Sequence, residues 1–150
     1  VYADYFKYIY DALDDKRLFS RSTENLPSGP LSRIDSQLFD FAQVARVTVH
    51  EAGQDFEDVF LAEEQLVLGL KAQVVQISLN LSWPWVGKAA GLLKDAGYFF
   101  GGILPQWYGD DALRMQKVLA RPNWEGIHLF SERANKILEF IRADWEKGAE

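Results

Sequence analysis

The sequence predicts a mixed α/β domain, and three observations carry that prediction. Apolar residues recur with a helical period in some segments and a strand-like pattern in others, and the two kinds of segment alternate. Residues 74–81 form the most strand-like run and are apolar enough for a strand buried on both faces. The length of 150 residues suits one domain. We therefore expect helices packed on a mixed sheet.

The first part of the chain is expected to contain a helix and then a loop. Residues 1–15 predict an amphipathic helix, because aromatic and aliphatic residues recur on one face and charged residues on the other. Residues 16–36 combine proline, glycine and serine with little periodicity, which predicts a loop or linker. Residues 37–150 are expected to form the domain itself. The apolar face of the first helix consists of Tyr2, Tyr5, Phe6, Ile9 and Leu13.

A strand hairpin and a helix are expected next. Leu38 and Phe39 precede β-branched alternation over residues 45–50, which favours two paired strands. Asp55 begins an acidic first turn, which predicts a helix that runs to about Lys71. Because that helix separates the strand at 45–50 from the strand at 74–81, we expect these two strands to be parallel, through a right-handed crossover.

The next helix has a start and a stop signal. Ser82 is expected to cap it and Pro84 to occupy its first turn. The helix is predicted over residues 85–96, and Gly97 is expected to end it.

The chain then predicts two strands and a final helix. Residues 98–104 and 112–118 should form an antiparallel pair, because a short turn-rich connection joins them. An amphipathic helix is expected from Phe130 to Trp145, with Ser131 near its start.

Composition disfavours several classes of function. The chain carries 16 basic and 22 acidic residues, and this net charge of −6 disfavours nucleic-acid binding, which depends on clustered lysine and arginine. With no cysteine and two histidines, we expect no thiol nucleophile and no metal site. We see neither a signal-peptide pattern nor an apolar run of the roughly 20 residues that span a bilayer, so we expect a cytoplasmic protein without a membrane partner. Because it begins at Val1 rather than Met, we expect a piece of a longer protein.

Four short runs carry a resemblance to a known family. They are QISLN at 76–80, LLKDAGY at 92–98, FFGGILP at 99–105 and GDDALRMQK at 109–117. Together they resemble the C-terminal half of a GNAT-type N-acetyltransferase. More narrowly, they are similar to the GNAT-like domains beside anti-sigma-factor kinase-type ATPase modules in bacteria. The resemblance covers about residues 41–141 and is specific only over residues 97–116, so it implies a partial GNAT-like fold.

The resemblance also implies where coenzyme chemistry would sit, and two positions depart from the family pattern. GNAT enzymes hold the coenzyme diphosphate on a glycine-rich turn at a helix N-terminus, because free N–H groups and the helix dipole favour an anion there. The corresponding residues 51–55 contain one glycine, and Asp55, Glu57 and Asp58 would repel a diphosphate. The position of the family's general-acid tyrosine is Leu93, which cannot transfer a proton.

Few residues remain as site candidates. No catalytic residue can be assigned beyond Glu51 as a weak candidate base. Trp107 and Tyr108 lie in a polar turn and predict either a partner or self-association patch or a fold-back onto the sheet. By the resemblance, two parallel strands should splay apart into a cleft lined by Val47, Val49, Gly53, Asn80 and Trp83.

Three functions follow as hypotheses. The first is a catalytically degenerate acetyltransferase-like module that senses a small acyl-CoA-like ligand or contacts a protein within a bacterial signalling protein. The second is an active acyl-CoA-dependent N-acyltransferase, for which acetyl-CoA or CoA would be the cofactor. The third is a pure protein-interaction module. An upstream kinase-like domain, another protein partner or a homodimer is left open.

Overall fold

The computed structural model describes residues 2–148. Four α-helices, five strands and one short 3-10 helix occur in them, in the order expected from the sequence. Val1, where the chain begins, lies outside the described residues. The elements are α1 (Ala3–Ala12), β1 (Arg33–Phe39), β2 (Val44–Glu51), α2 (Phe56–Gly69), β3 (Val74–Asn80), α3 (Val86–Asp95), β4 (Phe99–Leu104), β5 (Ala112–Val118), η1 (Trp124–Gly126) and α4 (Glu132–Gly148).

The five strands form one mixed sheet in the order β1-β2-β3-β5-β4. The pair β2/β3 is parallel, as the intervening helix α2 requires, and the pairs β1/β2, β3/β5 and β4/β5 are antiparallel. The predicted parallel pair and the predicted antiparallel pair are both confirmed. Strand β5 lies between β3 and β4, and β4 forms one edge of the sheet. The mixed α/β fold class is therefore confirmed.

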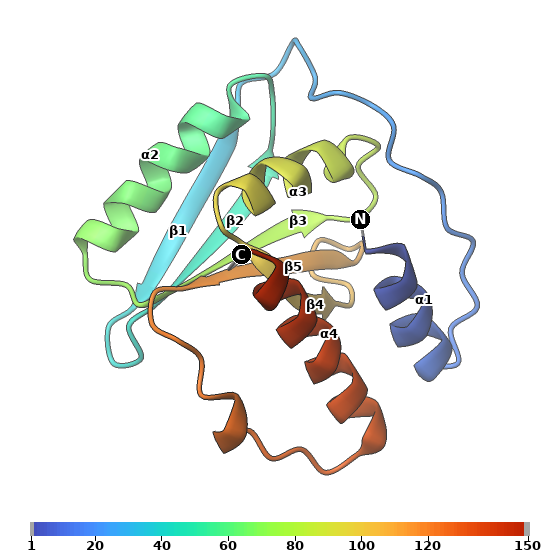
Figure 1. Ribbon diagram of the computed structural model, residues 1–150. Coiled ribbons are helices and arrows are strands. Elements are labelled where there is room, and N and C mark those ends of the chain that lie inside the picture. The colour runs from blue at the N-terminus through green and yellow to red at the C-terminus, as the bar shows by residue number, and fades with distance from the viewer. Residues whose placement is uncertain (1, 149–150) are drawn as a thin grey trace.

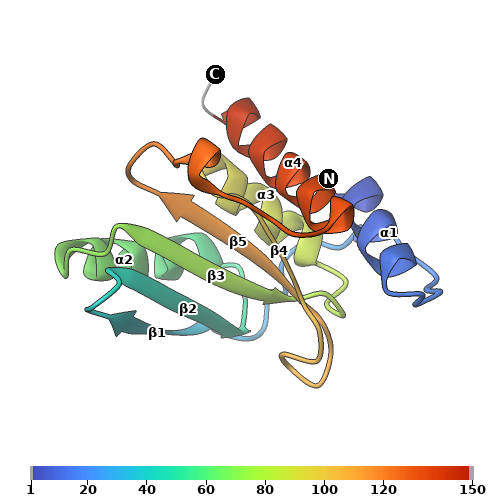
Figure 2. The same ribbon diagram turned by 90° about the horizontal axis from the view of Figure 1, so that it is seen from below.

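All four α-helices pack on the same face of the sheet (Figures 1 and 2). Side-chain alternation along the strands agrees: Val47, Ile77 and Met115 share one face, and each is buried. Helix α2 contacts this face through an ion pair from Glu64 to Lys117, and α1 does so through the Tyr2 ring against Phe100. Within residues 2–148, the opposite face carries no α-helix, and Figure 2 shows the β4–β5 connection on that side.

One predicted helix cap is absent and one helix end is confirmed. Ser82 does not cap α3, because its hydroxyl donates to Asn80 Oδ1 at 2.8 Å and Trp85 occupies the N-cap position without a side-chain bond. Gly97 does end the helix, with φ at +88°. The Gly97 N–H donates to the Lys94 carbonyl oxygen, and the Tyr98 N–H donates to the Leu93 carbonyl oxygen. This pair of hydrogen bonds requires a left-handed residue at the helix end.

Three boundaries differ from the sequence prediction. Strand β1 begins at Arg33, inside the segment expected to be loop, because residues 33–36 already pair with β2. Leu13 and Phe130 were expected on apolar helix faces, but both lie beyond the helix ends and are exposed. Ser131 does stand at the start of α4, where its Oγ accepts from Ala134 N at 3.1 Å.

A buried carboxylate joins three helices to the edge strand. Asp144 of α4 is almost fully buried, and its Oδ2 accepts from Tyr2 Oη at 2.7 Å and from Phe100 N at 2.8 Å. Its Oδ1 accepts from Lys94 Nζ at 2.8 Å. Because both of its oxygens accept hydrogen bonds, the carboxylate is tolerated in the core. This interaction fixes α1 and α4 over β4.

Candidate functional site

The turn between β2 and α2 is held by the segment that precedes β1. Gly53 N donates to Ser32 Oγ at 2.9 Å. In return, Ser32 donates from its backbone N at 2.9 Å and from its hydroxyl at 2.7 Å to Asp55 Oδ1. Asp55 therefore does not cap its own helix with its side chain. The hydrogen bonds from Ser32 hold the pKa of Asp55 below its usual range.

The same segment leaves no space above Gly53. A Cβ placed on Gly53 would lie 1.9 Å from the carbonyl oxygen of Pro30. That distance is far inside a van der Waals contact, so only glycine fits where the two backbones cross. The position at which a helix N-terminus offers its N–H groups to an anion is thus covered by the chain itself.

The start of α3 is held in a similar way. Gly87 N donates to Ser22 Oγ at 2.8 Å, and the Ser22 hydroxyl donates to the Pro84 carbonyl oxygen at 2.7 Å. Residues 22–32 therefore run from the start of α3 to the start of α2, along the border of the molecule in Figure 1. We call this stretch the crossing segment. One serine hydroxyl at each end of it accepts a backbone N–H from a helix start.

A tyrosine occupies the point where the parallel strands separate. The pairing of β2 with β3 ends at Thr48 and Ser78, although both strands continue. Tyr108 Oη donates to the Ser78 carbonyl oxygen at 2.8 Å. Burial raises the pKa of Tyr108, while a hydrogen bond from the Val49 backbone and the charge of Arg114 oppose the shift. The phenol hydroxyl thus lies between the diverging ends of β2 and β3.

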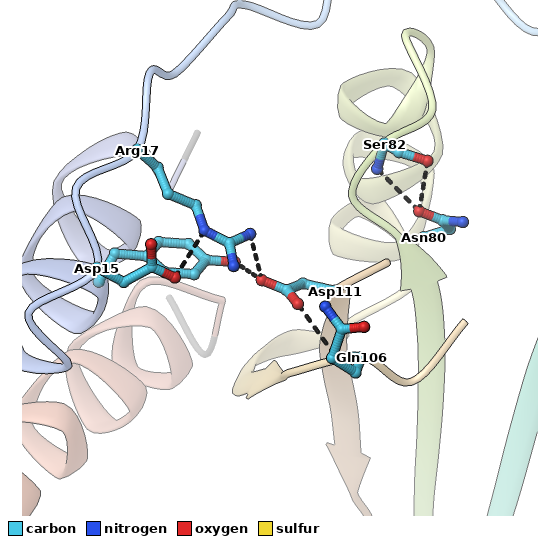
Figure 3. A network of polar contacts seen from close by, with 7 residues as sticks. Asp15, Arg17, Asn80, Ser82, Gln106 and Asp111 are labelled. Atoms are coloured by element: carbon cyan, nitrogen blue, oxygen red, sulfur yellow. Dashed lines mark hydrogen bonds and ion pairs between the residues drawn. The ribbon is translucent and has the colours of Figure 1, made fainter. Parts of the chain in front are cut away.

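The predicted cleft residues surround this tyrosine in part. Trp83 stacks on Trp85 with ring centroids 4.4 Å apart and lies 5.8 Å from Tyr108. Val47 and Val49 are buried in the helix-covered core, and Gly53 lies at the crossing segment. Asn80 is buried and uses its Oδ1 to hold the N–H and hydroxyl of Ser82 (Figure 3). These residues are therefore distributed among the helix-covered core, the crossing segment and the ring of Tyr108.

The remaining candidates are spread over the molecule. Glu51 is exposed at the end of β2. Leu93 lies in the core, and its side chain can neither donate nor accept a proton. His50 pairs with Asp35, Nε2 to Oδ1 at 2.8 Å, on the exposed face. Trp107 is 41% exposed. The turn that contains it folds back toward the sheet through its neighbour Tyr108.

Sequence reasoning missed the role of Asp111, which joins the first helix to the β4–β5 turn (Figure 3). Its Oδ2 accepts from Tyr10 Oη at 2.5 Å and from Arg17 Nη1 at 2.6 Å, and its Oδ1 accepts from Gln106 N at 3.0 Å. Burial alone would raise the pKa of Asp111, but these donors and the Arg17 charge lower it. A signal was present, since an acidic pair in a glycine-containing turn is typical of turn bonding.

A separate cavity of about 670 Å³ lies between α1, α3 and the residues after α1. Its volume is within the range of small-molecule sites. Part of its wall is the loop of residues 17–22, and the rest comes from helices and the ends of two strands. The apolar wall residues include Tyr2, Phe6, Leu81, Val86, Ala90 and Leu113.

Within residues 2–148, no cluster of three or more histidine, aspartate or glutamate side chains is placed to hold a metal ion. None of the helices in that range combines the length and the apolar character needed to cross a membrane.

The fold and the site define an α/β domain with helices on one face of a mixed sheet. At the starts of α2 and α3, serine hydroxyl groups of the crossing segment accept hydrogen bonds from backbone N–H groups. No family model matches the sequence, and no curated protein does. Among solved structures, the chain is similar to ribosomal-protein-alanine N-acetyltransferase from Brucella melitensis, with 19% identity and a TM-score of 0.46. It is also similar to Ard1 from Thermoplasma volcanium, with 15% identity and a TM-score of 0.44.

These similarities are partial in both directions. The alignments cover 59% and 60% of this chain, and 61% and 64% of the two neighbours, so the match spans less than two thirds of either neighbour's length. The first neighbour is named as an N-acetyltransferase. At these identities the likeness concerns the fold and says nothing about activity.

Proposed function

We propose that this chain is a non-catalytic GNAT-like module that binds a small acyl-like molecule and acts through regulation rather than acyl transfer. The observation that carries the proposal is the bond from Gly53 N to Ser32 Oγ, together with the Pro30 carbonyl oxygen above Gly53. A coenzyme diphosphate needs those N–H groups free. In this chain the Gly53 N–H already has a partner, and the Pro30 carbonyl oxygen lies over the turn.

Two further residues support the loss of chemistry. Tyr108 Oη lies between the separating strands β2 and β3, where an extended thiol arm would need free backbone groups. Leu93 stands where the resemblance expects the general acid, and its side chain carries no proton to transfer. An active N-acyltransferase is the alternative, and it requires the crossing segment to leave Gly53.

The ligand part of the proposal rests on the cavity beside α1. Its walls are largely apolar, and its volume suits an acyl chain of moderate length. The cavity is bordered by Arg17, which is paired with Asp15 and Asp111, and by Arg21, whose positive charge favours an anionic end group on such a ligand. A role in signalling, with an upstream kinase-like domain as partner, is part of this proposal and would use ligand binding as its input.

Calorimetry with two ligands tests the proposal. Decanoate should bind with a one-to-one stoichiometry, and acetyl-CoA should neither bind nor release thiol in the presence of a panel of amines. Ala90→Phe fills the cavity and should abolish decanoate binding. Lys88→Phe adds the same ring to an exposed position of α3 and should leave binding unchanged.

The outcomes separate the alternatives. Turnover of acetyl-CoA would establish the N-acyltransferase and overturn the proposal. Absence of binding by decanoate, with no turnover, would favour a pure protein-interaction module whose contacts run through the exposed Trp107. Equal loss of binding in both α3 variants would show that decanoate does not occupy the cavity.

A further inference from the structure

Two arginines face the same side of the sheet, away from the helices. Arg46 lies on β2 and Arg114 on β5, and strand β3 runs between them. In the strand register, Arg46 pairs with Gln76 and Arg114 with Ser78, so both arginines point to the helix-free face. This face is separate from the cavity beside α1.

Both guanidinium groups converge beneath one aromatic ring. The Cζ atoms of Arg46 and Arg114 lie 5.8 and 5.5 Å from the centroid of the Trp107 ring. Arg46 Cζ also lies 4.9 Å from the Phe39 centroid. Attraction to the ring faces holds the two cations in place, although they repel each other.

Polar contacts satisfy these arginines only in part. Arg114 is 8% exposed, and it donates from Nε to Ser78 Oγ at 3.2 Å and from Nη1 to Gln76 Oε1 at 2.7 Å. Arg46 Nε is buried and has no hydrogen-bond partner in the part of the chain that the structure describes. A buried donor without a partner costs free energy, so an acceptor that is not part of this chain would stabilise it.

Acidic groups do not neutralise the pair. Among the ion pairs of residues 2–148, none includes Arg46 or Arg114. Asp35, on the same face, is bonded to His50. Burial and the neighbouring charge of Arg46 lower the pKa of Arg114, which is the effect expected of a cation that lacks a counterion. In a chain with net charge −6, two adjacent uncompensated arginines are unusual.

We propose that Arg46 and Arg114 form a binding site for a phosphate monoester group on the helix-free face of the sheet. A dianion neutralises both guanidinium groups at once, and its oxygens can accept from several guanidinium N–H donors. A carboxylate has half that charge. The partly exposed ring of Trp107 borders the site and lies within reach of the organic part of the ester.

The test follows the indole N–H signal of Trp107 by nuclear magnetic resonance at pH 7.5 and constant ionic strength, after assignment with Trp107→Phe. Inorganic phosphate and phenyl phosphate, each raised to 10 mM, should shift the signal saturably. Phenyl phosphate should bind more tightly, because its ring adds contact. Acetate over the same range should leave the signal in place.

Matched variants decide whether the two arginines are responsible. Arg46→Gln should weaken phosphate binding at least tenfold, and circular dichroism should show an intact fold, because within residues 2–148 Arg46 forms no ion pair and its Nε has no hydrogen-bond partner. Arg121→Gln removes one exposed charge elsewhere and should leave binding unchanged. No saturable shift with either phosphate compound, equal binding of acetate, or equal loss in the Arg121 variant would each overturn the proposal.

Discussion

The backbone N–H of Gly53 donates a hydrogen bond to the hydroxyl of Ser32, which lies 21 positions earlier in the chain, at 2.9 Å. This contact places the segment before the sheet directly over the start of α2. Together with the bond from Gly87 to Ser22, it uses backbone N–H groups at the starts of two helices. Helix starts of this kind attract anions in many proteins. Here the hydroxyl groups of Ser32 and Ser22 occupy the positions at which an anion would accept those N–H groups.

Gly53→Ala should destabilise the fold by about 2 kcal/mol, because the added Cβ would overlap the Pro30 carbonyl oxygen and force the crossing segment to move. Gly29→Ala adds the same methyl group where no atom lies within 4 Å and serves as the control. Urea unfolding of both variants measures the difference. Equal stability of the two variants would show that the segment does not press on Gly53.

Asp144→Asn should lower the free energy of unfolding by about 3 kcal/mol, because it leaves Lys94 without its buried counterion. The new amide N–H₂ group would also face the hydroxyl of Tyr2, which now donates to Asp144. Glu146→Gln removes an exposed carboxylate from the same helix and should change stability by less than about 0.5 kcal/mol. Thermal unfolding compares them, and a similar small effect at both positions would contradict this account of the core.

Asp111 should contribute a stability that disappears in acid. Its pKa is lower in the folded state than in the unfolded chain, where a value near 3.9 is usual. The folded state therefore binds fewer protons between the two values, so the stabilisation is fully present above the unfolded pKa and is lost as pH falls through the folded one.

Urea unfolding between pH 6 and pH 3 tests this expectation. The difference in unfolding free energy between the wild type and Asp111→Asn should be constant above about pH 5 and should shrink below about pH 4. Asp110→Asn alters the exposed neighbour and serves as the matched control. A difference for Asp111→Asn that persists unchanged to pH 3 would argue against the lowered pKa.

Tyr108→Phe removes the bond to the Ser78 carbonyl oxygen and should cost about 1 kcal/mol. Tyr8→Phe removes a hydroxyl that forms no hydrogen bond within residues 2–148 and should be close to neutral. Chemical unfolding gives both values. If the two variants are equally stable, the hydroxyl of Tyr108 does not bridge β2 and β3.

Local signals in the sequence predicted most of the framework. Alternation of β-branched residues located β2, the run at 74–81 located β3, and Gly97 ended α3 as its left-handed φ requires. The helix between β2 and β3 was sufficient to predict their parallel pairing. These features depend on residues close in sequence, where period and turn chemistry are informative.

Contacts between distant residues were not predictable in this way. Ser32 was assigned to a loop, and nothing in its neighbours indicates that it bonds Gly53. Serine is a common helix N-cap, but the hydroxyl of Ser82 donates instead to the side-chain oxygen of the nearby Asn80. Arg46 and Arg114 are 68 positions apart and meet only because β5 inserts beside β3.

The exchange of the Gly53 amide proton with solvent, measured with and without CoA, tests the central claim most directly. The account predicts slow exchange, because Ser32 Oγ holds that proton, and neither its rate nor its chemical shift should change in 5 mM CoA. Rapid exchange in the free protein, or a saturable shift of the Gly53 signal as CoA is added, would show that the turn is open to coenzyme and would contradict the account.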